Sequence, residues 1–492
     1  MIKVTYVNPI NMGSSFQSIF KKYPVKVSTI GLMLLPSLQL FSAAPAQRPN
    51  FILILTDDLG WTCSSQLMDK NIPNSKSDFY ETRNIERLAA RGVRFSNGYA
   101  PCALCTPSRR SIQFGQTPAR EGDEKFRENY HPDFKKVSAI PQFLKSISPD
   151  YRAAHYGKWD LRADIFPEDL GYDESDGNTG NRNGDMNSTK DTKWTDLFLN
   201  NDPKRIQTIT DRALNFMTRQ TKTGHPFYLQ ISHYATHVDI QTTEEAYQKY
   251  LQKKKGEVHN NPGWAGMLEN LDTGIGKIID RIDSMGIADN TYLVLMADNG
   301  AVEFLPPVKN KFDHPSVFKN HPNNYPLRGG KWTLYEGGVR VPFIVIGKGI
   351  KPGSQCDVPV TGWDLLPTFC DLAGNTSQLP DNLDGTSLRP LLEKGHEGMF
   401  KRKRDELVFH YFGKTHSAIR VGDYKLIKFW DLKKIELYNL REDVGELNDL
   451  SLKQPQKVKE LEAKLQAYLE EVNAEVLHPS GLKKKKKNDN DD

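Results

Sequence analysis

The sequence predicts an α/β fold: a large, mostly parallel sheet sandwiched by helices, with a smaller C-terminal subdomain of antiparallel sheet plus helix. Continuous apolar runs such as residues 51–55 and 291–297 are typical of strands buried on both faces. Amphipathic helical segments alternate with these runs, as in a parallel sheet covered on both sides. After Gly374 the pattern changes to short strands and turns, which predicts the smaller part.

We expect four parts along the 492 residues: an export signal at 1–46, the α/β domain at 47–375, the C-terminal α+β subdomain at 376–480 and a disordered charged tail at 481–492. Two lysines precede an apolar stretch that ends in Ala-Pro-Ala, which is typical of a cleavable signal. Pro36 and the short apolar core argue against a stable membrane span. The protein is therefore expected to be exported, to the periplasm or the medium of a bacterium.

The elements of the large part follow from apolar spacing and from residues that end helices. In chain order we expect strands at 51–55, 93–95, 151–156, 226–232, 291–297 and 343–346, and helices at 84–91, 138–146, 205–218 and 264–285. Helix 84–91 ends at Gly92, and helix 264–285 carries apolar residues at helical spacing from Met267 to Ile282. The polar segments 161–201 and 301–327 are expected to be loops, the kind of segment that carries specificity.

The small part is predicted from four short strand patterns followed by one amphipathic helix. The strands are expected at 407–412, 418–421, 424–429 and 436–439, and the helix at 456–472. A Gly422-Asp423 turn between neighbouring strands predicts antiparallel pairing.

Polar residues follow two of the buried strands, where parallel sheets bind ligands. Asp57 and Asp58 follow the first strand, and Asp298 and Asn299 follow the strand at 291–297. Three carboxylates and one amide oxygen suit a hard divalent cation such as Ca²⁺ or Mg²⁺, and the sequence has no His/Cys spacing typical of zinc. Each Asp pair alone would be weak evidence, because Asp at a strand end often caps the next helix.

The run Cys105-Thr-Pro-Ser-Arg109 is the most informative stretch of the chain. Pro107 is expected to keep Thr106 out of the helical region, so that a helix begins only after Cys105. A helix N-terminus favours an anion, and Arg109 can point back at it. The simple alternative is that Cys105 is a buried thiol beside a turn. Cys102 and Cys105 also form a C-x-x-C, but a redox or zinc site is a weaker hypothesis, because the sequence has no second C-x-x-C.

Composition and cysteine count set outer limits on function. Charged residues make up 26% of the chain and aromatic residues 10%. The net charge is +5, and five of the chain's positive charges form the lysine run 483–487 beside an acidic end. No basic-aromatic motif accompanies that run, so we expect no nucleic-acid partner. The five cysteines of an apparently exported chain are an odd number, so at least one of them is outside any disulfide. The other four permit up to two disulfides.

Residues 105–109 resemble the signature of the type I sulfatases, which belong to the alkaline-phosphatase-like superfamily. The resemblance implies that Cys105 is oxidised to formylglycine by a formylglycine-generating enzyme, and that one divalent cation, usually Ca²⁺, sits on the four strand-end residues above. Phe114 departs from the tail of that signature, where the family has Thr. The resemblance runs over residues 50–448 and includes the segment 436–446.

The same resemblance implies roles for the remaining site residues. Lys158, His237 and Lys331 match family positions. In the mechanism that the resemblance implies, a hydroxyl of hydrated formylglycine attacks sulfur, and His237, assisted by Lys331, protonates the departing alcohol. The family commonly has, where Asp160 stands, a His that helps to deprotonate the hydrate. A carboxylate can accept that proton too if Lys158 or Arg109 offsets its charge, and the alternative that Asp160 faces away stays open.

The expected substrate is a sulfated carbohydrate, with the sugar and the sulfate position left open. Polar loops could hydrogen-bond its hydroxyls, and the candidate substrate-binding residues are Arg328, His314, His321, Tyr325 and His410. A phosphomonoester or phosphonate hydrolase of the same superfamily and a catalytically inactive protein that binds sulfated glycans remain the alternatives.

Overall fold

The computed structural model describes residues 48–123, 125, 138–162, 164–184, 197–305, 322–377, 379–394, 400–411 and 415–476. The predicted export signal, the predicted charged tail, His314 and His321 lie outside the described residues. Within them, no helix is long and apolar enough to cross a membrane.

The large sheet has eight strands in the order β11-β2-β10-β9-β1-β7-β4-β5. These strands are β1 (Asn50–Thr56), β2 (Val93–Phe95), β4 (Arg152–Gly157), β5 (Glu174–Ser175), β7 (Phe227–Ser232), β9 (Thr291–Ala297), β10 (Phe343–Ile346) and β11 (Ser354–Cys356). Only β10 runs against its neighbours β9 and β2, whereas β9, β1, β7, β4 and β5 are parallel. The sheet is mostly parallel, as predicted.

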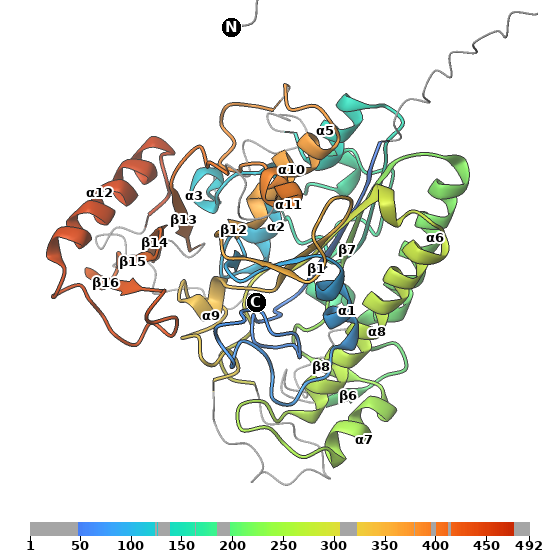
Figure 1. Ribbon diagram of the computed structural model, residues 1–492, viewed down its shortest axis with the longest axis horizontal. Coiled ribbons are helices and arrows are strands. Elements are labelled where there is room, and N and C mark those ends of the chain that lie inside the picture. The colour runs from blue at the N-terminus through green and yellow to red at the C-terminus, as the bar shows by residue number, and fades with distance from the viewer. Residues whose placement is uncertain are drawn as a thin grey trace, which may run out of the picture. The chain divides into compact units, whose positions relative to one another are not determined.

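Helices cover both faces of this sheet because alternate residues of each strand point to opposite sides. Ile52 and Ile54 of β1 pack in one core with α1 (Arg83–Arg91), α6 (Ile206–Thr223) and α8 (Pro262–Ser284). Phe51, Leu53 and Leu55 pack in the other core with α2 (Cys105–Phe114), α5 (Ile140–Ile147) and α10 (Leu365–Leu372), as can be followed in Figure 1. The predicted sandwich of helix, sheet and helix is confirmed.

Shorter elements connect these layers. They are α3 (Pro118–Glu121), α7 (Glu244–Gln252), α9 (Glu336–Val339), α11 (Arg389–Lys394) and the small strand pairs β3 (Gly98–Tyr99) with β12 (Val360–Thr361) and β6 (Leu197–Leu199) with β8 (Ile240–Thr242). The segment 161–201, predicted as a loop, carries β5 and β6 in its described parts.

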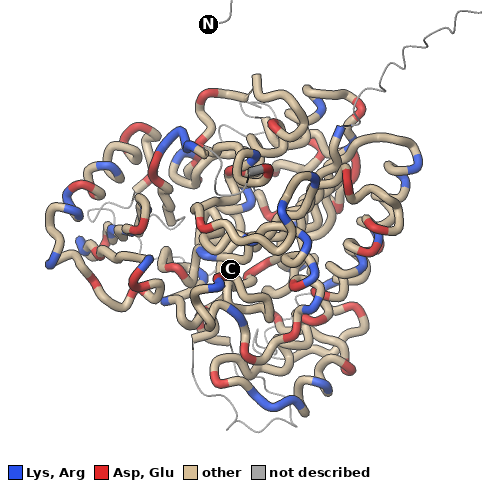
Figure 2. The backbone as a smooth tube through the Cα atoms, in the orientation of Figure 1, with Lys and Arg blue, Asp and Glu red and all other residues tan. Residues whose placement is uncertain are grey.

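The C-terminal subdomain is a four-stranded antiparallel meander covered by one helix, as predicted. Its strands are β13 (Glu406–His410), β14 (His416–Val421), β15 (Tyr424–Phe429) and β16 (Lys434–Asn439), and α12 (Pro455–Glu471) packs on one face. The opposite face packs against Tyr99 and Trp363 of the large part. Figure 2 shows positive and negative positions interspersed along α12 and α6. The boundary near residue 375 stays a prediction.

The start of α2 differs from the prediction. The helix begins at Cys105 itself, with Leu104 as its N-cap, and includes Thr106 and Pro107. The expectation that Pro107 excludes Thr106 from the helix is therefore wrong. The first four N–H groups of a helix have no partner within it, so a proline in the first turn removes no hydrogen bond.

Candidate active site

Four neighbouring parallel strands bring their carboxyl ends together at one edge of the large sheet. Asp57 and Asp58 follow β1, and Asp298 and Asn299 follow β9, whose last residue Ala297 lies opposite Thr56. Lys158 follows β4 directly, and His237 lies five residues beyond β7. Residues that are distant in the chain therefore meet, as the rule for parallel sheets predicts.

Three buried cations face three buried carboxylates at this edge. Lys158 Nζ lies 2.7 Å from Asp57 Oδ2, and Lys331 Nζ lies 2.9 Å from Asp58 Oδ2. Arg109 donates to Asp298 Oδ2 from Nε at 2.8 Å. Charges removed from water in this way require close partners of opposite sign, and each of these has one.

The acidic cluster fits a divalent cation. Carboxylate oxygens of Asp57, Asp58 and Asp298 lie within 4.8 Å of one another. Asp57 Oδ1 and Asn299 Oδ1 are buried and accept no hydrogen bond among the described residues. Buried oxygens without donors favour a cation between them, and an oxygen-only donor set is the one that Ca²⁺ or Mg²⁺ prefers.

Two of the three buried carboxylates in this cluster, Asp57 and Asp298, are held in different states. Burial opposes ionisation of Asp57, but the surrounding cations, Lys158 foremost, hold its pKa well below the usual range. Burial and the neighbouring charge of Asp57 raise the pKa of Asp298 to about 7. The excess negative charge that raises this pKa is the charge that a bound cation would neutralise.

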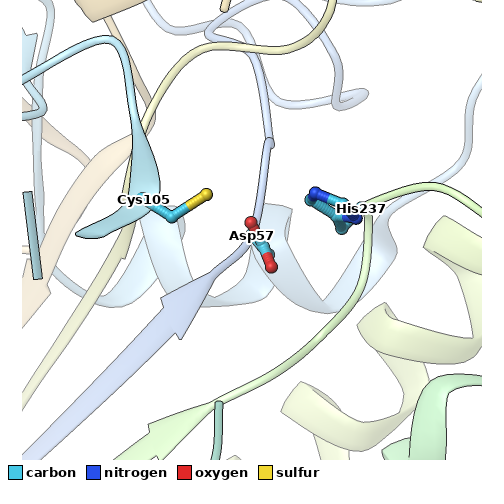
Figure 3. Close-up of side chains that lie close together, drawn as sticks. All are labelled: Asp57, Cys105 and His237. Carbon is cyan, nitrogen blue, oxygen red and sulfur yellow. The ribbon is translucent and has the colours of Figure 1, made fainter. Parts of the chain in front are cut away.

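Cys105 lies at the first position of α2, next to this cluster. Its sulfur, a carboxylate oxygen of Asp57 and a ring nitrogen of His237 lie within 4.8 Å of one another. Figure 3 shows the sulfur and the imidazole on opposite sides of Asp57. Burial raises the pKa of the Cys105 thiol to about 12, against the opposing effect of Lys158 and Lys331. Cys105 is thus the candidate nucleophile position.

His237 is held by the backbone beyond β7. Thr236 Oγ1 donates to the backbone oxygens of Asp57 and Asp58 at 3.2 Å each, which ties this segment to the end of β1. His237 Nδ1 contacts the backbone oxygen of Val238, and Nε2 lies 3.9 Å from Asp58 Oδ2. Burial and the charge of Lys331 lower the His237 pKa to about 4.

Asp160 lies beside the nucleophile position. Its Oδ2 accepts a hydrogen bond from Thr106 Oγ1 at 3.2 Å and lies 3.7 Å from Lys158 Nζ. The Asp160 carboxylate therefore lies next to Thr106, the residue that follows Cys105.

The predicted substrate-binding residues lie in different surroundings. Tyr325 is exposed, with 42% of its surface accessible. Arg328 donates to Tyr438 Oη at 2.9 Å and to the backbone oxygen of Glu446 at 3.1 Å. His410 is buried on β13, where Nδ1 pairs with Ser417 Oγ at 2.8 Å and Nε2 with the backbone oxygen of Glu475 at 3.0 Å. We therefore leave His410 out of the proposed substrate site.

Two supporting residues were not singled out from the sequence. Thr106 orients Asp160, and Thr236 ties the His237 segment to β1. Both are direct neighbours of predicted site residues, which is the signal that could have found them. All five cysteines lie among the described residues as buried thiols, and no disulfide links any two of them.

Comparisons with known proteins agree with this geometry. The family model "Sulfatase" matches residues 49–375, and the model "N-sulphoglucosamine sulphohydrolase, C-terminal" matches residues 330–475. The mouse N-acetylgalactosamine-6-sulfatase is 28% identical over 423 residues, covering 80% of this chain and 74% of its own. A sulfatase of Formosa agariphila is 26% identical, with 94% and 96% covered.

A solved structure shares the fold as well as the sequence pattern. The crystal structure of Ps i-CgsB superposes with a TM-score of 0.67 at 25% identity, covering 86% of this chain and 93% of that one. Together with the family model, which spans most of the chain, these matches show that the chain belongs to the sulfatase family and is a sulfuric ester hydrolase.

Proposed function

We propose that the chain removes O-sulfate groups from a sulfated saccharide and that residue 105, as formylglycine, supplies the nucleophile. The observation that supports this most is the grouping of Cys105, Asp57 and His237 within 4.8 Å. Three buried cations surround that group. A sulfate ester is an anion, and it would meet concentrated positive charge beside a nucleophile.

The unmodified thiol would be a poor nucleophile here. With a pKa of about 12, the Cys105 sulfur carries its proton at neutral pH, and the thiolate is the reactive form of cysteine. Oxidised to formylglycine, residue 105 would supply a hydrated aldehyde, whose hydroxyl can attack sulfur. This is the modification that the sequence signature implies.

The divalent cation has a defined place in this proposal. Asp57, Asp58, Asp298 and Asn299 would hold it, and it would supply positive charge to the sulfate oxygens. Lys158 and Lys331 have pKa values held above the usual range, because their carboxylate partners outweigh the effect of burial. Both remain charged at neutral pH and stabilise the anion directly.

His237 and Lys331 would serve the departing alcohol. A sulfate group entering the site offsets the charge of Lys331 and raises the His237 pKa, so that Nε2 can hold the proton it delivers. The Lys331 ammonium lies beside Asp58 in the same site. An alkoxide leaving from sulfur would thus meet both a proton donor and a fixed cation.

A saccharide is the substrate class that the relatives favour. The mouse relative is named as an N-acetylgalactosamine-6-sulfatase, and a second structure of Ps i-CgsB is described as a complex with k-i-k-neocarrahexaose. The export signal expected at residues 1–46 would bring the enzyme to extracellular polymers of this kind. We therefore infer a periplasmic or secreted enzyme acting on carbohydrate sulfate.

Mass spectrometry of the tryptic peptide 95–109 tests the nucleophile. Protein made together with a formylglycine-generating enzyme should show the mass loss of thiol-to-aldehyde conversion, and it should release inorganic sulfate from N-acetylgalactosamine 6-sulfate or a sulfated neocarrahexaose. Cys105→Ala should abolish both results. Cys102→Ala is the matched control, because Cys102 is a buried cysteine three residues earlier, whose sulfur donates to the backbone oxygen of His410 at 3.3 Å.

Chelation tests the cation in the same assay. EDTA should remove sulfate release, and added Ca²⁺ should restore it. An unmodified thiol from a competent host would contradict the proposed nucleophile. Release of phosphate from phosphomonoesters without release of sulfate would replace the proposal with a phosphomonoester hydrolase.

A further inference from the structure

Exposed aromatic side chains concentrate on the segment that carries Lys331. Among the described residues, four aromatic side chains are strongly exposed, and three of them are Phe304, Tyr325 and Trp332, at 54%, 42% and 53%. The described parts of this segment are tied together, because Lys331 N donates to the Ala301 oxygen at 2.9 Å. Exposed aromatic groups gathered on one loop system indicate a contact surface for something outside the chain.

Trp332 lies next to the catalytic cations. Its ring centre is 5.5 Å from Lys331 Nζ, and that ammonium is 2.9 Å from Asp58 Oδ2. Its backbone N–H donates at 2.9 Å to the oxygen of Ala103, two residues before Cys105. The half-exposed indole therefore borders the space in which the sulfate ester would react.

The backbone at Trp332 is in a conformation that favours glycine. Its φ is +74°, in the left-handed region, where a large side chain is rare and strained. The exposed indole also leaves a large apolar surface in water. Neither feature stabilises the fold, and strained residues of this kind concentrate at functional sites.

We propose that Trp332 is a stacking platform for a sugar ring of the sulfated substrate, an inference that rests on the proposed function. The C–H groups on one face of a pyranose form an apolar patch that can pack flat on an indole, while the hydroxyls stay in water. The sugar is bonded to the scissile sulfate ester, which would lie close to Lys331. The Trp332 indole beside this ammonium would therefore contact the sulfated sugar or its neighbour.

A series of substitutions separates stacking from a structural role. We expect Trp332→Gly and Trp332→Ala to raise KM for a sulfated neocarrahexaose about tenfold or more, and Trp332→Phe to recover most of the loss. Inhibition by inorganic sulfate should change little, because sulfate has no sugar ring. Trp332→Gly should also raise Tm, since glycine adopts this φ without strain. Phe166→Ala, at an exposed aromatic residue of another loop, is the matched control.

A binding measurement keeps this inference distinct from the proposed chemistry. In the Cys105→Ala background, the neocarrahexaose should protect tryptophan fluorescence from acrylamide quenching, and the protection should shrink when Trp332→Phe is added. This result supports the platform even if the wild type releases no sulfate. Equal protection in both proteins would overturn it, as would a sulfate inhibition constant that rises together with KM, because Trp332 would then act only by positioning Lys331.

Discussion

At the scale of single residues, Asp160 is held beside the proposed nucleophile position. Its carboxylate is fixed by Thr106 Oγ1 at 3.2 Å and lies 3.7 Å from Lys158 Nζ. Its φ of +53° lies in the left-handed region, which Asp adopts more readily than most residues. Lys158 offsets the repulsion between this carboxylate and an anionic sulfate group. We therefore propose Asp160 as the base that acts on the hydroxyl of a formylglycine at residue 105.

We expect Asp160→Asn to lower kcat by about 10²- to 10⁴-fold, because an amide cannot accept the proton. KM for a sulfated saccharide should change much less, since the cations and the metal ligands remain. The matched control is Thr106→Val, which keeps the carboxylate and removes only the hydrogen bond that orients it. Steady-state kinetics of sulfate release measure both. A kcat for Asp160→Asn close to that of Thr106→Val would show that the proton goes to another group.

At the scale of elements, the sequence predicts best where strands are long and continuously apolar. β1 and β9 were predicted with the Asp57 and Asp298 positions at their ends, because burial on both faces leaves a composition signal that needs no partner. α10 was missed, since its residues Leu365 to Cys370 are all buried and show no amphipathic stripe. Of the two- and three-residue strands, only β2 was predicted, and the others are too short for any period. The partners of His410 depend on strand pairing that no local pattern encodes.

The short helix α9 is held by ion pairs to residues that are distant in the chain. Its Glu336 Oε1 lies 2.8 Å from Lys425 Nζ on β15, and the same ammonium lies 2.9 Å from Glu446 Oε1. Glu336 N also donates to Glu446 Oε2 at 2.6 Å. All three side chains are fully buried, so this ion cluster fixes the segment that follows Lys331 onto the C-terminal sheet.

We expect Lys425→Met to lower the free energy of unfolding by about 3–5 kcal/mol, because it removes the ammonium shared by two buried carboxylates and leaves Glu336 a longer ion pair with Arg340 at 3.6 Å. Lys428→Met on the same strand is the control. Its ion pair with Glu462 is partly exposed, at 20% and 35%, so its loss should change stability by less than about 1 kcal/mol. Urea unfolding followed by circular dichroism measures both variants. Equal stability of the two variants would contradict the role of the buried cluster.

At the scale of the whole molecule, buried histidines connect folding to pH. Burial lowers the pKa of His155 on β4 to about 3 and that of His416 on β14 to about 4. These two residues lie in different sheets, so the effect is not confined to the active site. A histidine with a depressed pKa contributes stability that is fully present above the unfolded pKa near 6.5. That contribution is lost as the pH falls toward the folded value.

His416 allows this effect to be measured at one residue. Its ring stacks between Tyr411 and Phe429, at 4.6 and 5.5 Å, and its Nε2 accepts a hydrogen bond from Leu334 N at 3.3 Å, so the fold needs the neutral form. Protonation in acid removes that acceptor. Between pH 7.5 and 5, we expect the unfolding free energy of the wild type to fall by about 2 kcal/mol more than that of His416→Gln.

Glutamine keeps an acceptor for Leu334 N but does not titrate, so this variant isolates the charge. Urea unfolding at the two pH values gives the difference, and His225→Gln, beyond the end of α6, provides the control. If His416→Gln and the wild type lose equal stability on acidification, the acid sensitivity must come from other groups, among them the buried His155 and His233, whose pKa values burial also lowers. If the difference is near 2 kcal/mol, the single His416 ring, which accepts a hydrogen bond from Leu334 in the segment beside Lys331, couples the stability of the fold to pH.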